Sequence, residues 1–98
     1  MTERFLQKAK WFLEHNRYKE AEKELLQALQ ENPEEGEAKA LLAWVASKLN
    51  QQARALKLIQ EAVAAEPYNY WFYYIKANIH LQTNQIGLAE SAVKTGLE

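Results

Sequence analysis

The sequence contains no cysteine, which excludes a disulfide framework and a thiolate metal site. It has only three glycines and two prolines, too few for an all-β chain that turns about every ten residues. No apolar run approaches the roughly 18 residues of a membrane-spanning helix, and the N-terminus lacks the pattern of a signal peptide. Because 12 basic residues balance 13 acidic ones, the chain has no electrostatic footprint for nucleic acid.

The abundant residues are Ala, Leu, Glu, Lys and Gln, all of which favour helices. Apolar residues make up 48% of the chain and charged residues 26%, as in ordinary globular proteins. A length of 98 residues is enough to bury a modest core. We therefore predict one all-α domain over residues 1–98. The absence of cysteine fits a reducing, cytoplasmic location.

The chain is similar to itself at a shift of 34 residues. Pro33 then lies on Pro67, and an asparagine recurs as Asn16, Asn50 and Asn84. Residues that share one position of the 34-residue unit form a column. Three columns contain small residues: Ala9, Ala43 and Ala77; Ala21, Ala55 and Ala89; Ala28, Ala62 and Gly96. Two aliphatic columns are Leu25, Ile59 and Val93, and Leu29, Val63 and Leu97. The spacing predicts three repeats, over about 2–35, 36–69 and 70–98, of which the third is truncated.

Each recurring residue type has a structural reason. Asn tolerates the left-handed conformation that ends many helices, so the three asparagines predict stops between the two helices of each unit. Pro33 and Pro67 separate the units because proline interrupts a helix, and Asn69 is placed to cap the next helix. The alanine columns mark close helix crossings. The expected helices cover residues 3–15, 18–31, 36–49, 52–65, 70–82 and 86–97, although the aromatic run 70–74 taken alone favours a strand.

These columns resemble the tetratricopeptide repeat, a degenerate 34-residue pattern of small and large residues with a Pro near the end of each unit. The resemblance runs from Thr2 to Glu98. The matching residues are Phe5, Ala9, Phe12, Tyr18, Ala21, Leu25, Ala28 and Pro33, then Leu42, Ala43, Ala55, Ile59, Ala62 and Pro67, then Tyr73, Ala77, Ala89, Val93 and Gly96. The sequence departs from the family pattern at Lys8, Lys39, Ala46, Lys76 and His80, where we expect looser packing.

The resemblance implies a right-handed superhelical solenoid of three antiparallel helix–turn–helix hairpins. It also implies a protein–protein interaction scaffold, since the first helices of such repeats line a concave groove that holds a peptide or a partner segment. The inward-facing positions of each first helix share helical spacing. They include Glu3, Glu37 and Ala40, and the other inward-facing positions are the residues that we expect to bind a partner. These are Leu6, Lys10, Leu13, Trp44, Ser47, Trp71, Tyr74, Asn78 and Leu81.

Aromatic residues would make this groove a suitable binding surface, because Trp and Tyr bury a large area at low entropic cost. We expect Trp11, Phe72 and Tyr73 to pack between helices. For Trp44, Trp71 and Tyr74 a partner-binding role and mutual stacking both stay open.

One binding mode of the family is disfavoured. Members that grip the acidic tail of chaperones hold its carboxylate with basic and amide side chains on the inner helices. The matching positions here are Leu6, Lys10, Leu41, Trp71 and Ile75, of which only Lys10 is basic.

The sequence offers no catalytic, metal or cofactor site. His15 and His80 lack a second ligand at metal spacing, and we expect His15 to be a satisfied residue at a helix end. Ser47 and Ser91 have no nearby base, and no Gly-rich phosphate loop is present. We therefore predict neither an enzyme nor a small-molecule substrate.

Two alternatives to a peptide-binding scaffold stay open. Helix 86–97 would leave an apolar face uncovered, so we expect the chain to be a fragment of a longer array. The same open end favours a self-association module that forms a homodimer through open repeat ends. The chain could also be a regulatory segment of a larger or membrane-anchored protein.

Overall fold

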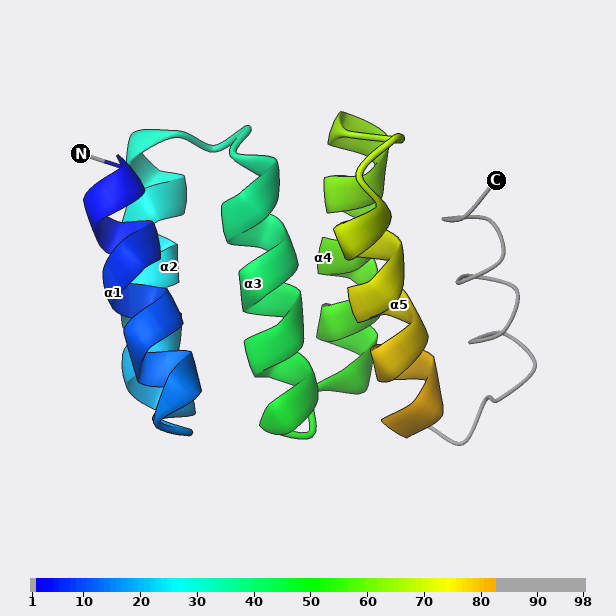
Figure 1. Cartoon of the computed structure of the whole chain (residues 1–98), viewed down its shortest axis with the longest axis horizontal. Helices are drawn as coiled ribbons and strands as arrows, with labels where there is room; N and C mark the ends of the chain where they lie inside the picture. Colours follow the sequence, from blue (N-terminus) through cyan, green and yellow to red (C-terminus); the bar gives the residue numbers. More distant parts are fainter. Residues whose placement is uncertain (1, 83–98) are drawn as a thin grey trace.

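A computed structural model describes residues 2–82 of the chain, which form five α-helices joined by short turns (Figure 1). They are α1 (Thr2–Glu14), α2 (Tyr18–Glu31), α3 (Gly36–Lys48), α4 (Gln52–Ala65) and α5 (Tyr70–Gln82). The five predicted helices in this range are confirmed to within one residue at each end, and the fold of residues 2–82 is all-α, without strands. The predicted helix 86–97 and the stop at Asn84 lie outside the described residues.

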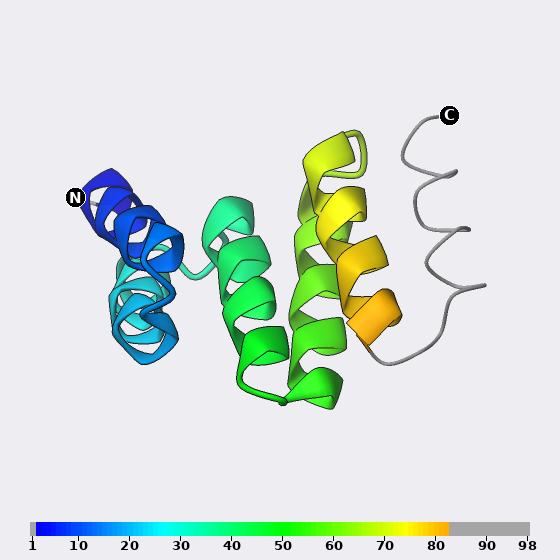
Figure 2. The same cartoon turned by 60° about the horizontal axis from the view of Figure 1, so that its bottom comes forward.

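The helices follow one another in chain order as an open array, and α2 and α4 lie behind α1, α3 and α5 in the view of Figure 1. Each helix packs on the next, and α3 also contacts α1 and α5 (Figures 1 and 2). Contacts confined to neighbouring elements define a solenoid. The handedness of its superhelix stays a prediction.

The turns inside the two hairpins have the same geometry, as the asparagine column predicts. Asn16 and Asn50 adopt positive φ angles of 58° and 63°. In each turn the next amide donates back five residues, from Arg17 to the Phe12 carbonyl and from Gln51 to the Ala46 carbonyl, both at 2.8 Å. This is the Schellman motif, in which a residue in the left-handed region satisfies the last carbonyls of a helix. The helix stops at both positions are confirmed.

The turns between hairpins also repeat. The Glu35 amide donates to the Asn32 carbonyl and the Asn69 amide to the Glu66 carbonyl, both at 3.1 Å. Asn69 Oδ1 accepts a hydrogen bond of 3.1 Å from the Trp71 amide, which is the N-cap contact predicted from the sequence.

Helix α3 joins the two hydrophobic clusters of the described core. On one side Leu42 and Val45 pack with residues of α1 and α2. On the other side Ala43 packs with residues of α4 and α5, including Ile59 and Phe72. Nine of the 13 residues of α3 are buried, so this helix is apolar nearly all round, as expected of a helix enclosed by neighbours.

The alanine columns lie where helices cross. Their described members have almost no exposed surface: Ala9, Ala21, Ala28, Ala43, Ala55, Ala62 and Ala77. A larger side chain there would hold the backbones apart. The column members Ala89 and Gly96 lie outside the described residues.

The aromatic residues behave less uniformly than expected. Phe72 is 1% exposed, which confirms its packing role, and half-buried Tyr73 donates its hydroxyl to the Pro67 carbonyl at 3.0 Å. The prediction that Trp11 packs between helices is wrong, since this residue is 50% exposed. Its ring stacks instead on His15, with ring centroids 4.0 Å apart.

The exposure of Trp11 has a simple cause. At the 34-residue shift its column contains Val45 and Ile79, and both of these are buried against the preceding hairpin. Within residues 2–82 no hairpin precedes α1, so the same column faces outward there. Lys8 is exposed for the same reason, whereas its counterpart Leu42 is buried. The expected loosening of the packing at Lys8 is therefore not found.

Candidate binding groove

Helices α1, α3 and α5 together form a pocket of about 250 Å³. We call it the aromatic pocket. Its lining residues are Leu13, Glu14, Leu41, Trp44, Trp71 and Tyr74. These three helices are the first helices of the three predicted repeats, so the pocket lies on the face that was expected to form a groove.

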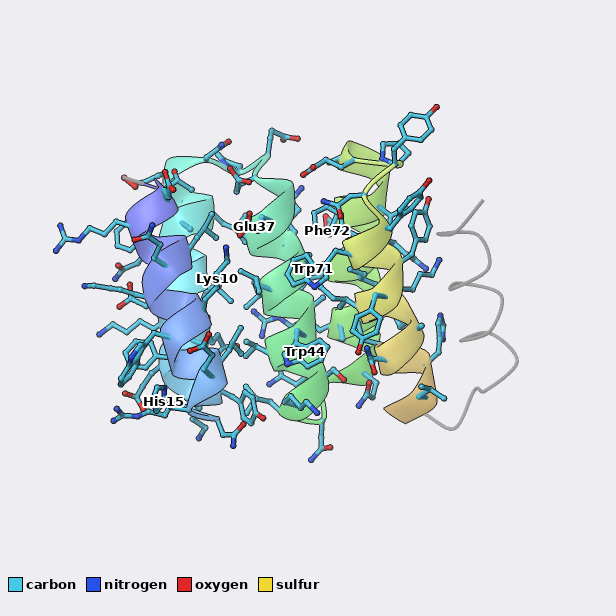
Figure 3. All side chains as sticks on the ribbon, viewed as in Figure 1. Lys10, His15, Glu37, Trp44, Trp71 and Phe72 are labelled. Atoms are coloured by element: carbon cyan, nitrogen blue, oxygen red, sulfur yellow. The ribbon has the colours of Figure 1, made fainter. Side chains whose placement is uncertain are left out.

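The buried residue Phe72 fixes the part of α5 that carries the two pocket residues Trp71 and Tyr74. Phe72 lies in the cluster that α5 shares with α3 and α4, and its neighbour Trp71 extends toward α3 (Figure 3). Trp71 and Tyr74 are three residues apart and therefore share one face of the helix. Both stay substantially exposed, at 43% and 57%. The fold thus buries Phe72 and presents its aromatic neighbours to the pocket.

Trp44 contributes from the middle of the array. It is half-buried on α3, and the Lys48 ammonium lies 5.4 Å from the centre of its ring, within the range of a cation–π contact. None of the ring pairs in contact among residues 2–82 joins two of Trp44, Trp71 and Tyr74. The three rings therefore line the pocket without stacking on one another.

A second pocket, of about 290 Å³, lies between α1 and the start of α3. We call it the polar pocket. Its lining residues are Glu3, Leu6, Gln7, Lys10, Glu35 and Glu37. Lys10 and Glu37 face each other across it (Figure 3) and form an ion pair with Nζ and Oε1 2.5 Å apart. Both partners are partly exposed, so the pair contributes little to stability.

The structure brings together six of the nine residues predicted to bind a partner. Leu13, Trp44, Trp71 and Tyr74 line the aromatic pocket, and Leu6 and Lys10 line the polar pocket.

The other three predicted residues line neither pocket. Ser47 is 4% exposed and offers almost no surface. Asn78 donates its side-chain amide to the Tyr74 carbonyl at 3.0 Å, while Leu81 is exposed.

Leu41 and Glu14 line the aromatic pocket but were not among the residues predicted to bind a partner, although Leu41 is an inner-helix position of the chaperone-tail mode. Leu41 is nearly buried and forms part of the wall through the small surface that it keeps. Glu14 lies four residues after Lys10 at the end of α1, so helical spacing places it on the same face as Lys10, and this spacing could have identified it.

The chaperone-tail binding mode has no support in this groove. Of the five matching positions, Leu6, Leu41 and Ile75 are buried aliphatic residues, and Lys10 is already paired with Glu37. A bound carboxylate would therefore lack the several free donors that this mode requires.

Residues 2–82 contain no group of three or more His, Asp or Glu side chains placed to hold a metal ion. His15 Nδ1 lies 2.8 Å from the Trp11 carbonyl, which confirms its role as a satisfied residue at a helix end. None of the helices in this range combines the length and apolarity that crossing a membrane requires.

An array of antiparallel helical hairpins with pockets along its first helices defines a helical-repeat protein. The family model of the tetratricopeptide repeat matches residues 12–61, just over half of the chain. The chain therefore belongs to the tetratricopeptide-repeat family. Repeats of this family commonly mediate protein–protein interactions and typically serve as non-catalytic scaffolds. A search of curated proteins finds no match.

Proposed function

We propose that this chain is a protein–protein interaction scaffold that binds a peptide or an extended partner segment in the groove formed by the aromatic and polar pockets. The observation that carries the proposal is the aromatic pocket, in which five of six lining residues are aromatic or aliphatic. Exposed Trp and Tyr side chains in a pocket are the residues that most often dominate binding energy at protein interfaces.

The size of the aromatic pocket fits one large side chain. A cavity of about 150 Å³ accommodates benzene, so a pocket of about 250 Å³ has room for a Leu, Met or Phe side chain. A single anchored side chain and its flanking backbone make a small interface, for which micromolar rather than nanomolar affinity is expected.

The tryptophan signals provide a direct test. The chain has three tryptophans, two in the aromatic pocket and one, Trp11, outside it. Peptides can be selected on the protein from a library of short random sequences, and a selected peptide can be titrated while the three indole N–H resonances are followed by NMR. Single Trp→Phe variants assign the resonances.

We expect the Trp44 and Trp71 resonances to shift with a common saturation curve and the Trp11 resonance to stay in place. If only the Trp11 resonance moved, or if the library yielded no binding peptide, the proposal would be wrong.

Self-association through open repeat ends would use the outward face of α1, which is mainly charged. The outward face of this helix carries Arg4, Lys8 and His15 where α3 carries the apolar Ala38, Leu42 and Leu49. Trp11 lies on the same face and is 50% exposed, so this face combines charged side chains with one exposed aromatic ring. The other open end involves helix 86–97, outside the described residues.

The cytoplasmic location and the division into three repeats stay predictions.

A further inference from the structure

The two pockets follow one another along the same pair of helices. On α3 they are marked by Glu37 and Trp44, seven residues apart, and on α1 by Leu6 and Leu13, also seven residues apart. At a rise of 1.5 Å per residue the pocket centres are separated by about 10 Å. An extended peptide in the polyproline II conformation advances about 3.1 Å per residue with three residues per turn. Side chains three residues apart therefore point the same way and would reach both pockets.

The polar pocket has an excess of negative charge. Three carboxylates, of Glu3, Glu35 and Glu37, face a single ammonium, that of Lys10. Glu37 is paired with Lys10. Within residues 2–82 the Glu35 carboxylate accepts one long hydrogen bond, of 3.5 Å, from the neutral side-chain amide of Asn32. Among residues 2–82 no basic side chain pairs with Glu3.

The aromatic pocket adds little to this excess, because the Lys48 ammonium offsets its single carboxylate. Glu14 is its only charged lining residue, and the nearby Lys48 is engaged over the Trp44 ring. Across both pockets the lining residues therefore comprise four carboxylates and one ammonium. A surface with this charge favours cationic partners and repels acidic ones.

We propose that the partner segment is extended and carries an apolar side chain for the aromatic pocket and a Lys or Arg side chain for the polar pocket, about three residues away. The proposal rests on the proposed function and adds to it the chemistry of the partner. An Arg or Lys would find the unpaired carboxylates of Glu3 and Glu35 without displacing Lys10 from Glu37.

The acidic residues also have a local role, which the test must separate from binding. Glu3 and Glu37 lie in the first turns of α1 and α3, where the helix dipole favours negative charge. Their replacement therefore lowers helix stability slightly, and the readout must be the binding of a peptide by the folded protein.

Peptides selected from the random library, with Trp44→Ala/Trp71→Ala as counter-selection, test the proposal. We expect the retained peptides to share an apolar residue and a Lys or Arg at a spacing of about three. A chosen peptide and its Arg→Gln version are then measured against wild type and Glu3→Gln/Glu35→Gln. Glu61→Gln is the control, because Glu61 is exposed on α4 and lines neither pocket.

We expect Arg→Gln in the peptide, or Glu3→Gln/Glu35→Gln in the protein, to weaken binding about two- to five-fold at low salt. The two changes together should weaken binding by less than the product of the two single fold-losses, because they remove the same contact. Glu61→Gln should leave the affinity unchanged. Groove-dependent peptides without a basic residue, or an unchanged affinity, would overturn the charge assignment and leave the proposed function intact. If no peptide distinguished wild type from Trp44→Ala/Trp71→Ala, the proposed function itself would fail.

Discussion

Replacement of Trp44 and Trp71 by alanine is expected to abolish the binding of any peptide selected on the groove. Truncation of a Trp at the centre of an interface typically costs about 2 kcal/mol or more, which is roughly a 30-fold loss of affinity for each residue. The two rings line one pocket without stacking on each other, so each should contribute its own contact area. Isothermal titration of the single and double variants measures the losses.

Trp11→Ala is the matched control for this experiment. It removes the same side chain from α1, at a position that lines neither pocket and is 50% exposed. Its affinity for the peptide should stay within about two-fold of wild type, because it removes no contact with the peptide. Circular dichroism must show unchanged helicity for all variants. An equal loss of affinity in Trp11→Ala and Trp71→Ala would contradict the assignment of the groove.

The second large effect concerns stability. Phe72 is the largest fully buried side chain of residues 2–82, and it packs in the cluster that joins α5 to α3 and α4. Phe72→Ala should lower the free energy of unfolding by about 3–5 kcal/mol through lost burial and the cavity left behind. Phe72→Leu conserves more of the volume and should cost less than about 1.5 kcal/mol. Denaturant unfolding followed by circular dichroism measures both.

Tyr68→Ala serves as the control, since Tyr68 is 91% exposed in the turn before α5 and should change stability by less than about 0.5 kcal/mol. A loss below about 1 kcal/mol for Phe72→Ala would show that α5 is not held by this contact. Because Phe72 also holds Trp71 in the pocket, the alanine variant should bind the selected peptide more weakly even where it stays folded.

The helix boundaries could be predicted because Asn and Pro residues, which end or begin helices, recur at a fixed spacing. Asn16 and Asn50 end helices through a backbone conformation that few other residues adopt easily, and Asn69 caps α5 through its side chain. The aromatic start of α5 favours a strand when taken alone. The repeat register gave the correct answer there, since the same columns in α3 are helical.

The surroundings of individual side chains could be predicted only in part. A column describes a residue by its place in a unit, whereas burial depends on whether another unit packs against it. Trp11 and Val45 share a column, but only Val45 has a preceding hairpin to bury it. Side-chain length matters as well. Ser47 is in the column of Leu13 but is too short to reach the groove surface, and it is buried among its neighbours.

The charge pairing across the groove could not be predicted from single columns. Lys10 and Glu37 come from different repeats and different positions of the unit. Their contact depends on the separation and orientation of α1 and α3, which follow from the packing of both helices on α2. The aromatic character of the groove, by contrast, was evident from Trp44, Trp71 and Tyr74 in the inward-facing columns.

The central claim is that a partner segment lies in the groove between α1, α3 and α5, and site-specific photo-crosslinking tests it most directly. A photoreactive phenylalanine analogue is placed at Tyr74, in the aromatic pocket, or at Tyr68, exposed in the turn outside it. Each protein is irradiated with a selected peptide, and the product is identified by mass spectrometry. We expect the peptide to crosslink to position 74 and not to position 68. Crosslinking at position 68 with none at position 74 would contradict the claim.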